Sequence, residues 1–422
     1  MGGVTSVVAT TLSCALAAAL LAGTVSVAAR DWPQWRGPNR DGVSPETQLL
    51  QQWPPAGPPQ LWLRHDLGAG FSAPAAVGDR LYLLANDDLE SEYIRALSAV
   101  DGRTIWSVRL GRVGPNDAPP HPAARSTPTV VGDRIYALGS DGDLVCVNRD
   151  DGGVRWRVNL RTQFDGRPGS WAYAESPRVE RGRVVVTPGG VATMVALDAA
   201  TGRVQWTSSV PGGDRAAYSS ISLATVAGRA VYVQFVESAL IGVDAETGAF
   251  LWRYDKANRE RAKVATPVTR GDLVYTASAP IGGALLKLES GATGVTANEI
   301  YNLRGLPNSI GGSVLVDDTL YGTTIDGLVA VDFETGEVRW RHQSIGPASV
   351  LYADGRLYLH GENGEVALVD ASAEAYRELG RFTPAARPVR RGDQAWVYPV
   401  VAGGRLFIRE HGTVWAFDVR RR

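Results

Sequence analysis

One short pattern recurs along this chain and constrains its fold more than any other feature. A run of β-forming residues leads to an Asp, then to a turn that ends in Gly, and then to a second β-run that ends in Trp. The pattern reads DGDLVCVNRDDGGVRW at 141–156, ATMVALDAATGRVQW at 192–206, SALIGVDAETGAFLW at 238–252 and DGLVAVDFETGEVRW at 326–340. Such repetition predicts several copies of one supersecondary unit, packed side by side.

A second recurring piece lies upstream of the first. It reads SAPAAVGDRLYLL at 72–84, STPTVVGDRIYAL at 126–138, SPRVERGRVVVT at 176–187 and ATPVTRGDLVYTA at 265–277. In each copy two alternating β-runs flank a Gly-Asp or Gly-Arg pair, which favours a hairpin turn. The two pieces together predict four antiparallel strands per unit.

The spacing of these units predicts a β-propeller. The Trp that ends the fourth strand recurs at intervals of 39 to 50 residues, and a Tyr takes its place in one unit. These positions are Trp62, Trp106, Trp156, Trp206, Trp252, Tyr301 and Trp340. Four strands in each unit of this length are typical of propeller blades.

The two ends of the chain are expected to share one blade. The innermost strands begin near Ser72, Ser126, Ser176, Ser220, Thr266, Ser309, Ser349 and Tyr398. The unit that begins at Tyr398 has no fourth strand, whereas 59–68 reads as a fourth strand with no preceding three. Pairing the two fragments closes the ring and removes exposed strand edges. We therefore expect residues 60–422 to form one all-β, eight-bladed propeller of four-stranded antiparallel blades.

The segment ALDAATGRVQW resembles the tryptophan-docking repeat of the quinoprotein propeller family, in which Ala, Asp, Thr-Gly and Trp recur in each blade. In physical terms, Asp198 can bond amides of the turn, Gly202 accepts a positive φ, and Trp206 fills space between blades. We expect a structural role, and none in catalysis, for Trp62, Trp106, Trp156, Trp206, Trp252 and Trp340.

The resemblance implies two classes of function. Some members are dehydrogenases that hold pyrroloquinoline quinone and Ca²⁺ on the propeller axis. Others keep only the scaffold, and they include the propeller lipoprotein of the outer-membrane barrel-assembly machinery and other exported proteins. Alcohol dehydrogenases of this family are longer and carry a vicinal cysteine pair, whereas Cys14 and Cys146 are the two cysteines here. The resemblance therefore favours the branch without a cofactor, and the quinone with Ca²⁺ is the alternative.

The first 29 residues are typical of a secretory signal peptide. They are largely apolar, carry no charged side chain and end in Val27-Ala28-Ala29, which suits cleavage after Ala29. An uncleaved anchor is the alternative, because Lys and Arg are missing from this leader. We expect export to the periplasm or the cell exterior, with no transmembrane segment after the leader. Cys146, in the strand-like DLVCVN, is expected to be a buried thiol.

Composition narrows the class of partner. The formal net charge is −1 and 44% of the residues are hydrophobic, which suits a globular protein and gives no general attraction to nucleic acid. We expect a monomer that binds an envelope protein or peptide.

The residues just before the innermost strands are expected to ring one mouth of the central channel. Besides Phe71, they are Arg125, Trp171, Tyr173, Glu175, Tyr218, Lys263, Asn308, Trp396 and Tyr398. Aromatic surface with a few charges is the usual composition of a small-molecule or peptide site. Glu175 and Asn308 could supply oxygen ligands to Ca²⁺. Alternatively, Arg125, Glu175 and Lys263 neutralise one another around a water-filled channel.

The segment 30–59 is rich in Trp, Pro and Arg, and is called the strap below. Its residues 31–44 read DWPQWRGPNRDGVS, and it leads into the closing strand. We expect Trp32 and Trp35 to anchor it on the propeller body or across one mouth, with Arg36, Arg40 and Asp41 pairing to the surface of the propeller. The expected function is a non-catalytic exported scaffold that binds its partner through loops at one mouth. A quinone- and Ca²⁺-dependent oxidoreductase of alcohols or sugars is the alternative.

Overall fold

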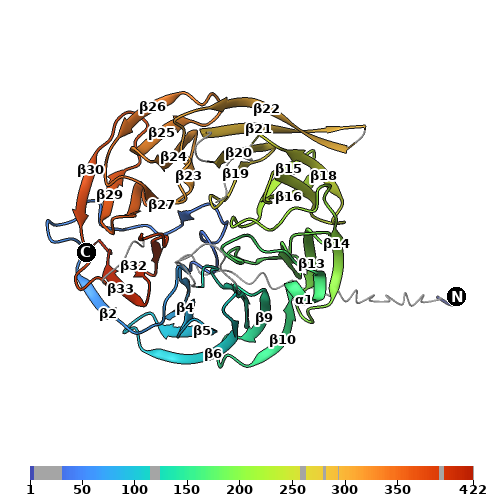
Figure 1. The fold of residues 1–422 in the computed structure, drawn as a ribbon, viewed down its shortest axis with the longest axis horizontal. Helices are drawn as coiled ribbons and strands as arrows, with labels where there is room; N and C mark the ends of the chain where they lie inside the picture. The colour runs from blue at the N-terminus through green and yellow to red at the C-terminus, as the bar shows by residue number, and fades with distance from the viewer. Residues whose placement is uncertain are drawn as a thin grey trace.

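In a computed structural model, the chain forms a ring of blades around a central axis (Figure 1). The structure describes residues 1–3, 31–114, 124–256, 263–278, 282–292, 294–388 and 394–421. Among these residues the strands form seven four-stranded sheets and one five-stranded sheet, and each sheet is one blade. The predicted eight-bladed propeller is confirmed. The predicted leader lies outside the described residues, except for its first three.

Blades 1 to 4 follow one another along the chain. Blade 1 consists of β3 (Ala75–Val77), β4 (Arg80–Asn86), β5 (Ser91–Ser98) and β6 (Thr104–Arg112). Blade 2 consists of β7 (Thr129–Val131), β8 (Arg134–Leu138), β9 (Asp143–Asn148) and β10 (Val154–Asn159), and the short helix α1 (Leu160–Phe164) follows it. Blade 3 consists of β11 (Arg178–Glu180), β12 (Arg183–Val186), β13 (Met194–Asp198) and β14 (Val204–Ser208). Blade 4 consists of β15 (Ser222–Val226), β16 (Arg229–Phe235), β17 (Leu240–Asp244) and β18 (Phe250–Tyr254).

Blades 5 to 8 complete the ring. Blade 5 consists of β19 (Val268–Arg270), β20 (Leu273–Ser278), β21 (Gly282–Gly291) and β22 (Gly294–Leu303). Blade 6 consists of β23 (Ser313–Val316), β24 (Thr319–Thr324), β25 (Gly327–Asp332) and β26 (Val338–His342). Blade 7 consists of β27 (Ala348–Ala353), β28 (Arg356–Gly361), β29 (Val366–Asp370) and β30 (Glu378–Phe382), and β1 (Val43–Ser44) joins it. Blade 8 consists of β31 (Val400–Ala402), β32 (Arg405–Glu410), β33 (Thr413–Asp418) and β2 (Gln60–Arg64).

The ring is closed by the first and last blade strands of the chain. β2 pairs antiparallel with β33, with Trp62 opposite Ala416 and Leu63 opposite Trp415. This pairing satisfies the edge of β33 that the C-terminal unit alone would leave exposed. The predicted closure is therefore present in the structure.

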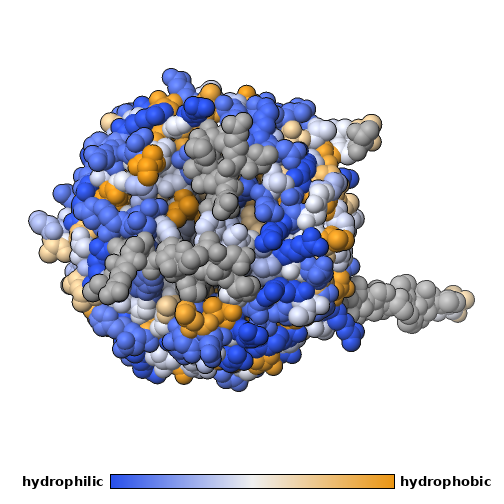
Figure 2. Space-filling model, in the orientation of Figure 1, coloured by the Kyte–Doolittle hydropathy of each residue, from blue (hydrophilic) through white to orange (hydrophobic). Residues whose placement is uncertain are grey.

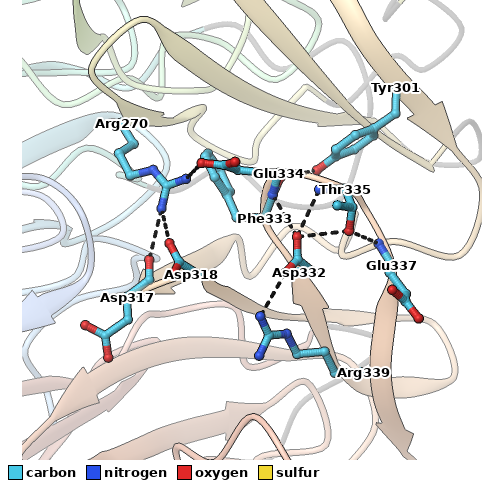
Figure 3. Close-up of polar contacts among 10 residues, drawn as sticks. All are labelled: Arg270, Tyr301, Asp317, Asp318, Asp332, Phe333, Glu334, Thr335, Glu337 and Arg339. Atoms are coloured by element: carbon cyan, nitrogen blue, oxygen red, sulfur yellow. Dashed lines mark hydrogen bonds and ion pairs between the residues drawn. The ribbon is translucent and has the colours of Figure 1, made fainter.

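The repeated Asp-x-x-x-Gly turn is held by its own side chains. The Oδ1 atom of Asp332 accepts hydrogen bonds from the amides of Glu334 and Thr335 and from the Thr335 hydroxyl, at 2.9 to 3.2 Å (Figure 3). Tyr301 of blade 5 donates to the carbonyl of Phe333 in this turn at 2.9 Å. The tyrosine that replaces a repeat tryptophan thus joins its blade to the next one.

Four of the six repeat tryptophans dock on the following blade through a hydrogen bond. The Nε1 atom of Trp156, in blade 2, donates to the carbonyl of Ala199 in blade 3 at 3.1 Å. A Cβ on Gly202, where φ is +72°, would lie 2.9 Å from this indole, so the turn accepts only glycine there. Trp62, Trp106 and Trp340 donate similarly to the following blade.

Cys146 is buried opposite Trp156 in the sheet of blade 2, where burial raises the pKa of its thiol to about 11.

The direction of the strands determines on which face of the ring each loop or hairpin turn lies. Because the four strands of a blade are antiparallel, the loops that join successive blades all lie on one side, called the loop face. The hairpin turns between the first and second strands lie on the opposite side, called the turn face. No helix of the described residues is long and apolar enough to cross a membrane.

The strap contacts turns of the turn face, where Asp31 accepts from the amide of Gly78 and Glu46 from that of Gly403. Part of it runs across the middle of the ring (Figure 1). Trp32 bridges Ala76 of blade 1, and the carbonyl of Pro33 accepts from the amide of Val130 in blade 2 at 2.8 Å. β1 then pairs in parallel with β27, so blade 7 gains a fifth strand that the repeat pattern did not predict.

Farther along, the strap fastens to turns of blades 7 and 8 before it becomes β2. The carboxylate of Glu46 accepts from the amides of Gly403 and Gly404, at 2.6 and 3.2 Å. Trp53 is buried and meets the rings of Tyr358 and Phe382 edge to face. The strap is thus part of the hydrophobic core.

The strap arginines are buried between the strap and the ring. Arg36 and Arg40 are 3% and 6% exposed. Arg36 donates to the carbonyls of Asp41 and Ser313, and Arg40 donates to those of Ser176 and Pro177. Apart from Asp41, which belongs to the strap, these partners are backbone carbonyls at or just before the innermost strands of blades 3 and 6.

Candidate functional site

An aromatic pocket lies on the axis where the loop-face residues converge, with a volume of about 360 Å³. Its described lining combines aromatic rings, small residues and one guanidinium. The lining residues are Trp35, Phe71, Arg125, Trp171, Ala174, Ser176, Tyr218, Ser220, Val264, Ile310, Trp396 and Tyr398. We call this cavity the aromatic pocket.

Neighbouring aromatic residues of the wall support one another. The rings of Phe71 and Trp396 are 5.4 Å apart, as are those of Trp171 and Tyr218. The Tyr218 hydroxyl also accepts a hydrogen bond from the amide of Trp171 at 3.2 Å. Each of these residues is brought to the axis by the loop before an innermost strand. Contacts between successive loops therefore hold the wall in place.

The strap supplies the floor of the aromatic pocket. The ring of Trp35 lies edge to face against Tyr398, with centroids 4.6 Å apart. Its Nε1 atom donates to the Thr266 hydroxyl at 3.0 Å. Trp35 of the strap is therefore held in place as part of the pocket lining.

Arg125 is the one charged side chain among the described lining residues. Its Nη1 atom donates to the carbonyl of Trp171 at 3.0 Å, and its guanidinium lies 5.9 Å from the centre of the Phe71 ring. Burial lowers the pKa of Arg125 to about 10, and the nearby Glu92 opposes this shift. The guanidinium therefore stays positively charged at neutral pH.

Glu92 lies behind the wall of the pocket. It is fully buried, and its Oε2 atom accepts from the amide of Ser140 at 2.7 Å. Burial raises the pKa of Glu92 to about 7, although Ser140 and Arg125 favour the charged form. Its carboxyl group therefore changes charge near neutral pH.

The structure brings five of the nine predicted mouth residues to the aromatic pocket, together with Phe71. The five are Arg125, Trp171, Tyr218, Trp396 and Tyr398. The other four, Tyr173, Glu175, Lys263 and Asn308, are not among its lining residues. Consequently Arg125, Glu175 and Lys263 do not meet as a neutralising trio in this pocket.

The four remaining predicted residues are engaged in bonds within the fold. The Tyr173 hydroxyl donates to the carbonyl of Pro188 at 2.8 Å, and Lys263 Nζ donates to that of Glu237 at 2.6 Å. The carboxylate of Glu175 accepts from the amide of Thr187 and from Gln234 Nε2, each at 2.6 Å. The backbone amide of Asn308 donates to the carbonyl of Thr323 at 3.1 Å.

Several lining residues were not predicted as members of the site. Ser176 and Ser220 occupy corresponding positions of the repeat, at the start of their innermost strands, so comparing the units could have identified them. Ala174, Val264 and Ile310 carry no chemical signal in the sequence. Trp35 was assigned only an anchoring role, because nothing local shows that its ring reaches the axis.

A quinone with Ca²⁺ does not fit the described lining. Ca²⁺ takes about six to eight oxygen ligands, several of them carboxylates. The described residues of the aromatic pocket offer one guanidinium and no carboxylate, and both oxygens of the Glu175 carboxylate accept bonds elsewhere. Within the described ranges, no group of three or more His, Cys, Asp or Glu side chains could hold a metal ion. We therefore derive no chemistry through these cofactors.

The chain is similar to proteins of the bacterial outer membrane assembly system and, in fold, to quinoprotein dehydrogenases. Outer membrane protein assembly factor BamB from Shewanella oneidensis is 23% identical over 334 residues, which cover 73% of this chain and 78% of that protein. The crystal structure of BamB from Moraxella catarrhalis superposes with a TM-score of 0.59 at 16% identity, covering 86% of this chain and 98% of the other.

Quinohemoprotein alcohol dehydrogenase from Comamonas testosteroni superposes with a TM-score of 0.63 at 14% identity, covering 93% of this chain and 81% of the other. At these identities the structural likeness shows the shared propeller alone. The family model described as outer membrane protein assembly factor BamB matches residues 59–170 and 90–342. Because these matches together span more than half of the chain, the chain belongs to the family that this model describes.

Proposed function

We propose that this protein is an exported, non-catalytic propeller scaffold that binds a partner protein during the assembly of outer-membrane proteins. In this proposal the aromatic pocket receives an apolar side chain of the partner, and the surrounding loops contact its backbone. Arg125 then faces a polar or negatively charged group beside that side chain. The observation that carries the proposal is the aromatic pocket itself, walled by Phe71, Trp171 and Trp396.

The chemistry of this lining supports protein binding. Trp, Tyr and Arg are the residue types that most often dominate the binding energy of protein interfaces, and they do so in recesses that exclude water. The wall residues are already ordered by mutual contacts, so binding costs little side-chain entropy. Figure 2 shows that hydrophobic side chains around the rim of the ring are scattered among hydrophilic ones, which suits a partner anchored at the axis.

The names of the relatives suggest which class of protein is the partner. The relatives in Shewanella and Moraxella carry the name outer membrane protein assembly factor, and the propeller covers most of their length. The predicted leader supports an exported location, where such a partner is present. The poor fit of a quinone and Ca²⁺ to the described lining favours binding over oxidation.

Site-specific photo-crosslinking in the cell envelope tests the proposal. A photoreactive phenylalanine analogue in place of Phe71 is expected to capture a discrete envelope protein. The same analogue in place of Val204, which is 45% exposed on the outer strand β14, is the matched control and should capture none. The substitution Ala174→Trp fills the aromatic pocket and should remove the crosslink without lowering the melting temperature.

Two results would contradict the proposal. One is an identical crosslinking pattern at positions 71 and 204, because the pocket would then confer no selectivity. The other is saturable binding of pyrroloquinoline quinone with Ca²⁺ at micromolar concentration, measured by absorbance titration. That second result would favour the oxidoreductase function.

A further inference from the structure

A second cavity, of about 570 Å³, lies under the strap on the turn face. We call it the arginine cavity. Its charged lining comes from Arg36, Arg40 and Asp41 of the strap, from Arg178 and Glu180 of β11, and from Arg270 of β19. The exposed Asn39 also lines it, so the cavity reaches solvent at the edge of the strap. Trp35 lines the aromatic pocket and is not among the lining residues of the arginine cavity.

The strap arginines bring positive charge into this cavity without carboxylate partners. Arg40 donates to the carbonyls of Ser176 and Pro177 at 2.9 and 3.1 Å, and to the side-chain oxygen of Gln34 at 3.2 Å. The Nε atoms of Arg36 and Arg40 are buried and have no hydrogen-bond partner among the described residues. A buried donor without a partner is costly, unless a ligand or water completes its bonding.

The acidic residues of the lining compensate only part of this charge. Glu180 accepts from Nε and Nη2 of Arg178, at 2.9 and 2.6 Å. Burial raises the pKa of Asp41, whereas the nearby Arg36 opposes this shift. Burial and repulsion from Arg178 lower the pKa of Arg40 to about 9, which is expected where positive charges crowd together.

Arg270 lines the arginine cavity and already forms ion pairs with two carboxylates. It pairs with Asp318 and Glu334, each at 2.6 Å, and its guanidinium lies 4.7 Å from the centre of the Phe333 ring (Figure 3). These contacts tie blade 5 to blade 6 and neutralise the charge of Arg270. The positive charge without a carboxylate partner therefore belongs to the more deeply buried Arg36 and Arg40.

We propose that the arginine cavity binds a small molecule that carries two or more negatively charged oxyanion groups, with Arg36 and Arg40 as its principal partners and Arg178, which also pairs with Glu180, beside them. Guanidinium groups pair with carboxylates and phosphates through short, charge-assisted hydrogen bonds. A bound polyanion would offset the excess of positive charge in the lining. Because two ligands come from the strap, such a molecule would also fasten the strap to blade 3. This site is separate from the aromatic pocket and does not depend on its function.

Isothermal titration of the full mature chain tests this proposal with pyrophosphate and with citrate at low ionic strength, and with sucrose as the uncharged control. At least one polyanion is expected to bind in a one-to-one ratio, with an affinity that falls as salt is added. Binding of pyrophosphate alone would assign a phosphate-bearing ligand, and binding of citrate alone a carboxylate-bearing one.

The decisive variant is Glu180→Gln, which removes a negative charge from the lining. It is expected to tighten polyanion binding about three- to tenfold, a gain that a folding defect cannot imitate. The matched control is Glu246→Gln, which makes the same change of net charge at a carboxylate that pairs with Arg183, outside the cavity lining. Arg40→Gln should weaken binding about tenfold or more.

Two outcomes would overturn the proposal. One is the lack of measurable binding of either polyanion at millimolar concentration. The other is binding that Glu180→Gln and Glu246→Gln change to the same extent, because the effect would then reflect only the overall charge of the protein.

Discussion

Trp35 and Tyr398 meet edge to face with ring centroids 4.6 Å apart, so the strap and blade 8 together build the floor of the aromatic pocket. The two residues come from opposite ends of the chain. Their contact couples the docking of the strap to the shape of the candidate binding site. A change in either residue is therefore expected to affect both stability and binding.

A double-mutant cycle measures this coupling. We expect Trp35→Leu and Tyr398→Leu together to cost about 0.5–1.5 kcal/mol less than the sum of the single variants, because the aromatic pair is lost only once. The measurement is urea unfolding of the three variants and the wild type. The control cycle pairs Trp35→Leu with Tyr358→Leu, since Tyr358 contacts Trp53 instead, and its coupling should be near zero. A zero value for the first cycle would show that the ring contact contributes nothing.

The strap is expected to stabilise the ring through Trp53. Trp53 is 4% exposed and contacts the rings of Tyr358 and Phe382. Trp53→Ala should lower the free energy of unfolding by about 3–5 kcal/mol, because it removes a large buried ring and leaves a cavity. The matched control is Val191→Ala on the exposed surface, where a change within about 0.5 kcal/mol is expected. Equal effects of the two substitutions would mean that the strap does not belong to the core.

The indole N–H groups of the docking tryptophans are expected to contribute differently to the free energy of unfolding. Trp156 donates to the carbonyl of Ala199, whereas Nε1 of Trp252 is buried without a partner among the described residues. Both Trp→Phe changes remove similar apolar volume. Trp156→Phe also loses a hydrogen bond, so it should be more destabilising than Trp252→Phe by about 1 kcal/mol, measured by thermal or urea unfolding. The reverse order would contradict the role assigned to this bond.

Glu175 is expected to make stability depend on pH. Burial raises its pKa to about 7 from an ordinary value of 4.5, so the folded protein holds this proton over a range in which the unfolded chain releases it. Its contribution to the free energy of unfolding therefore falls as the pH rises from about 5 to about 7, and then stays constant.

The variant Glu175→Gln isolates this contribution. Relative to the wild type, the variant should gain stability between about pH 5 and pH 7, by up to about 3 kcal/mol. The measurement is urea unfolding at several pH values. Glu92, whose pKa is also raised to about 7, is present in both proteins and cancels in the difference. A difference that does not change with pH would show that Glu175 is ionised throughout this range.

The repeat made the architecture predictable, but only part of the site. Arg125, Trp171, Tyr218, Trp396 and Tyr398 were identifiable because their places before innermost strands lead to the axis in any propeller. Glu175 and Tyr173 occupy the same kind of loop, yet their side chains bond within the blades. The loop position alone does not determine the direction of each side chain, because that depends on donors and acceptors of neighbouring blades.

The sequence by itself determined the number of blades, their four-stranded pattern and the closure of the ring. These features follow from periodic local signals that are repeated along the chain, so each unit reinforces the same interpretation. Only the tertiary structure decided what the strap does. Its arginines bond carbonyls of residues such as Ser176 and Ser313, and its Trp35 reaches Thr266. Because these partners come together only around the closed ring, no pattern within the strap could show that it lines both an aromatic pocket and an arginine-lined cavity.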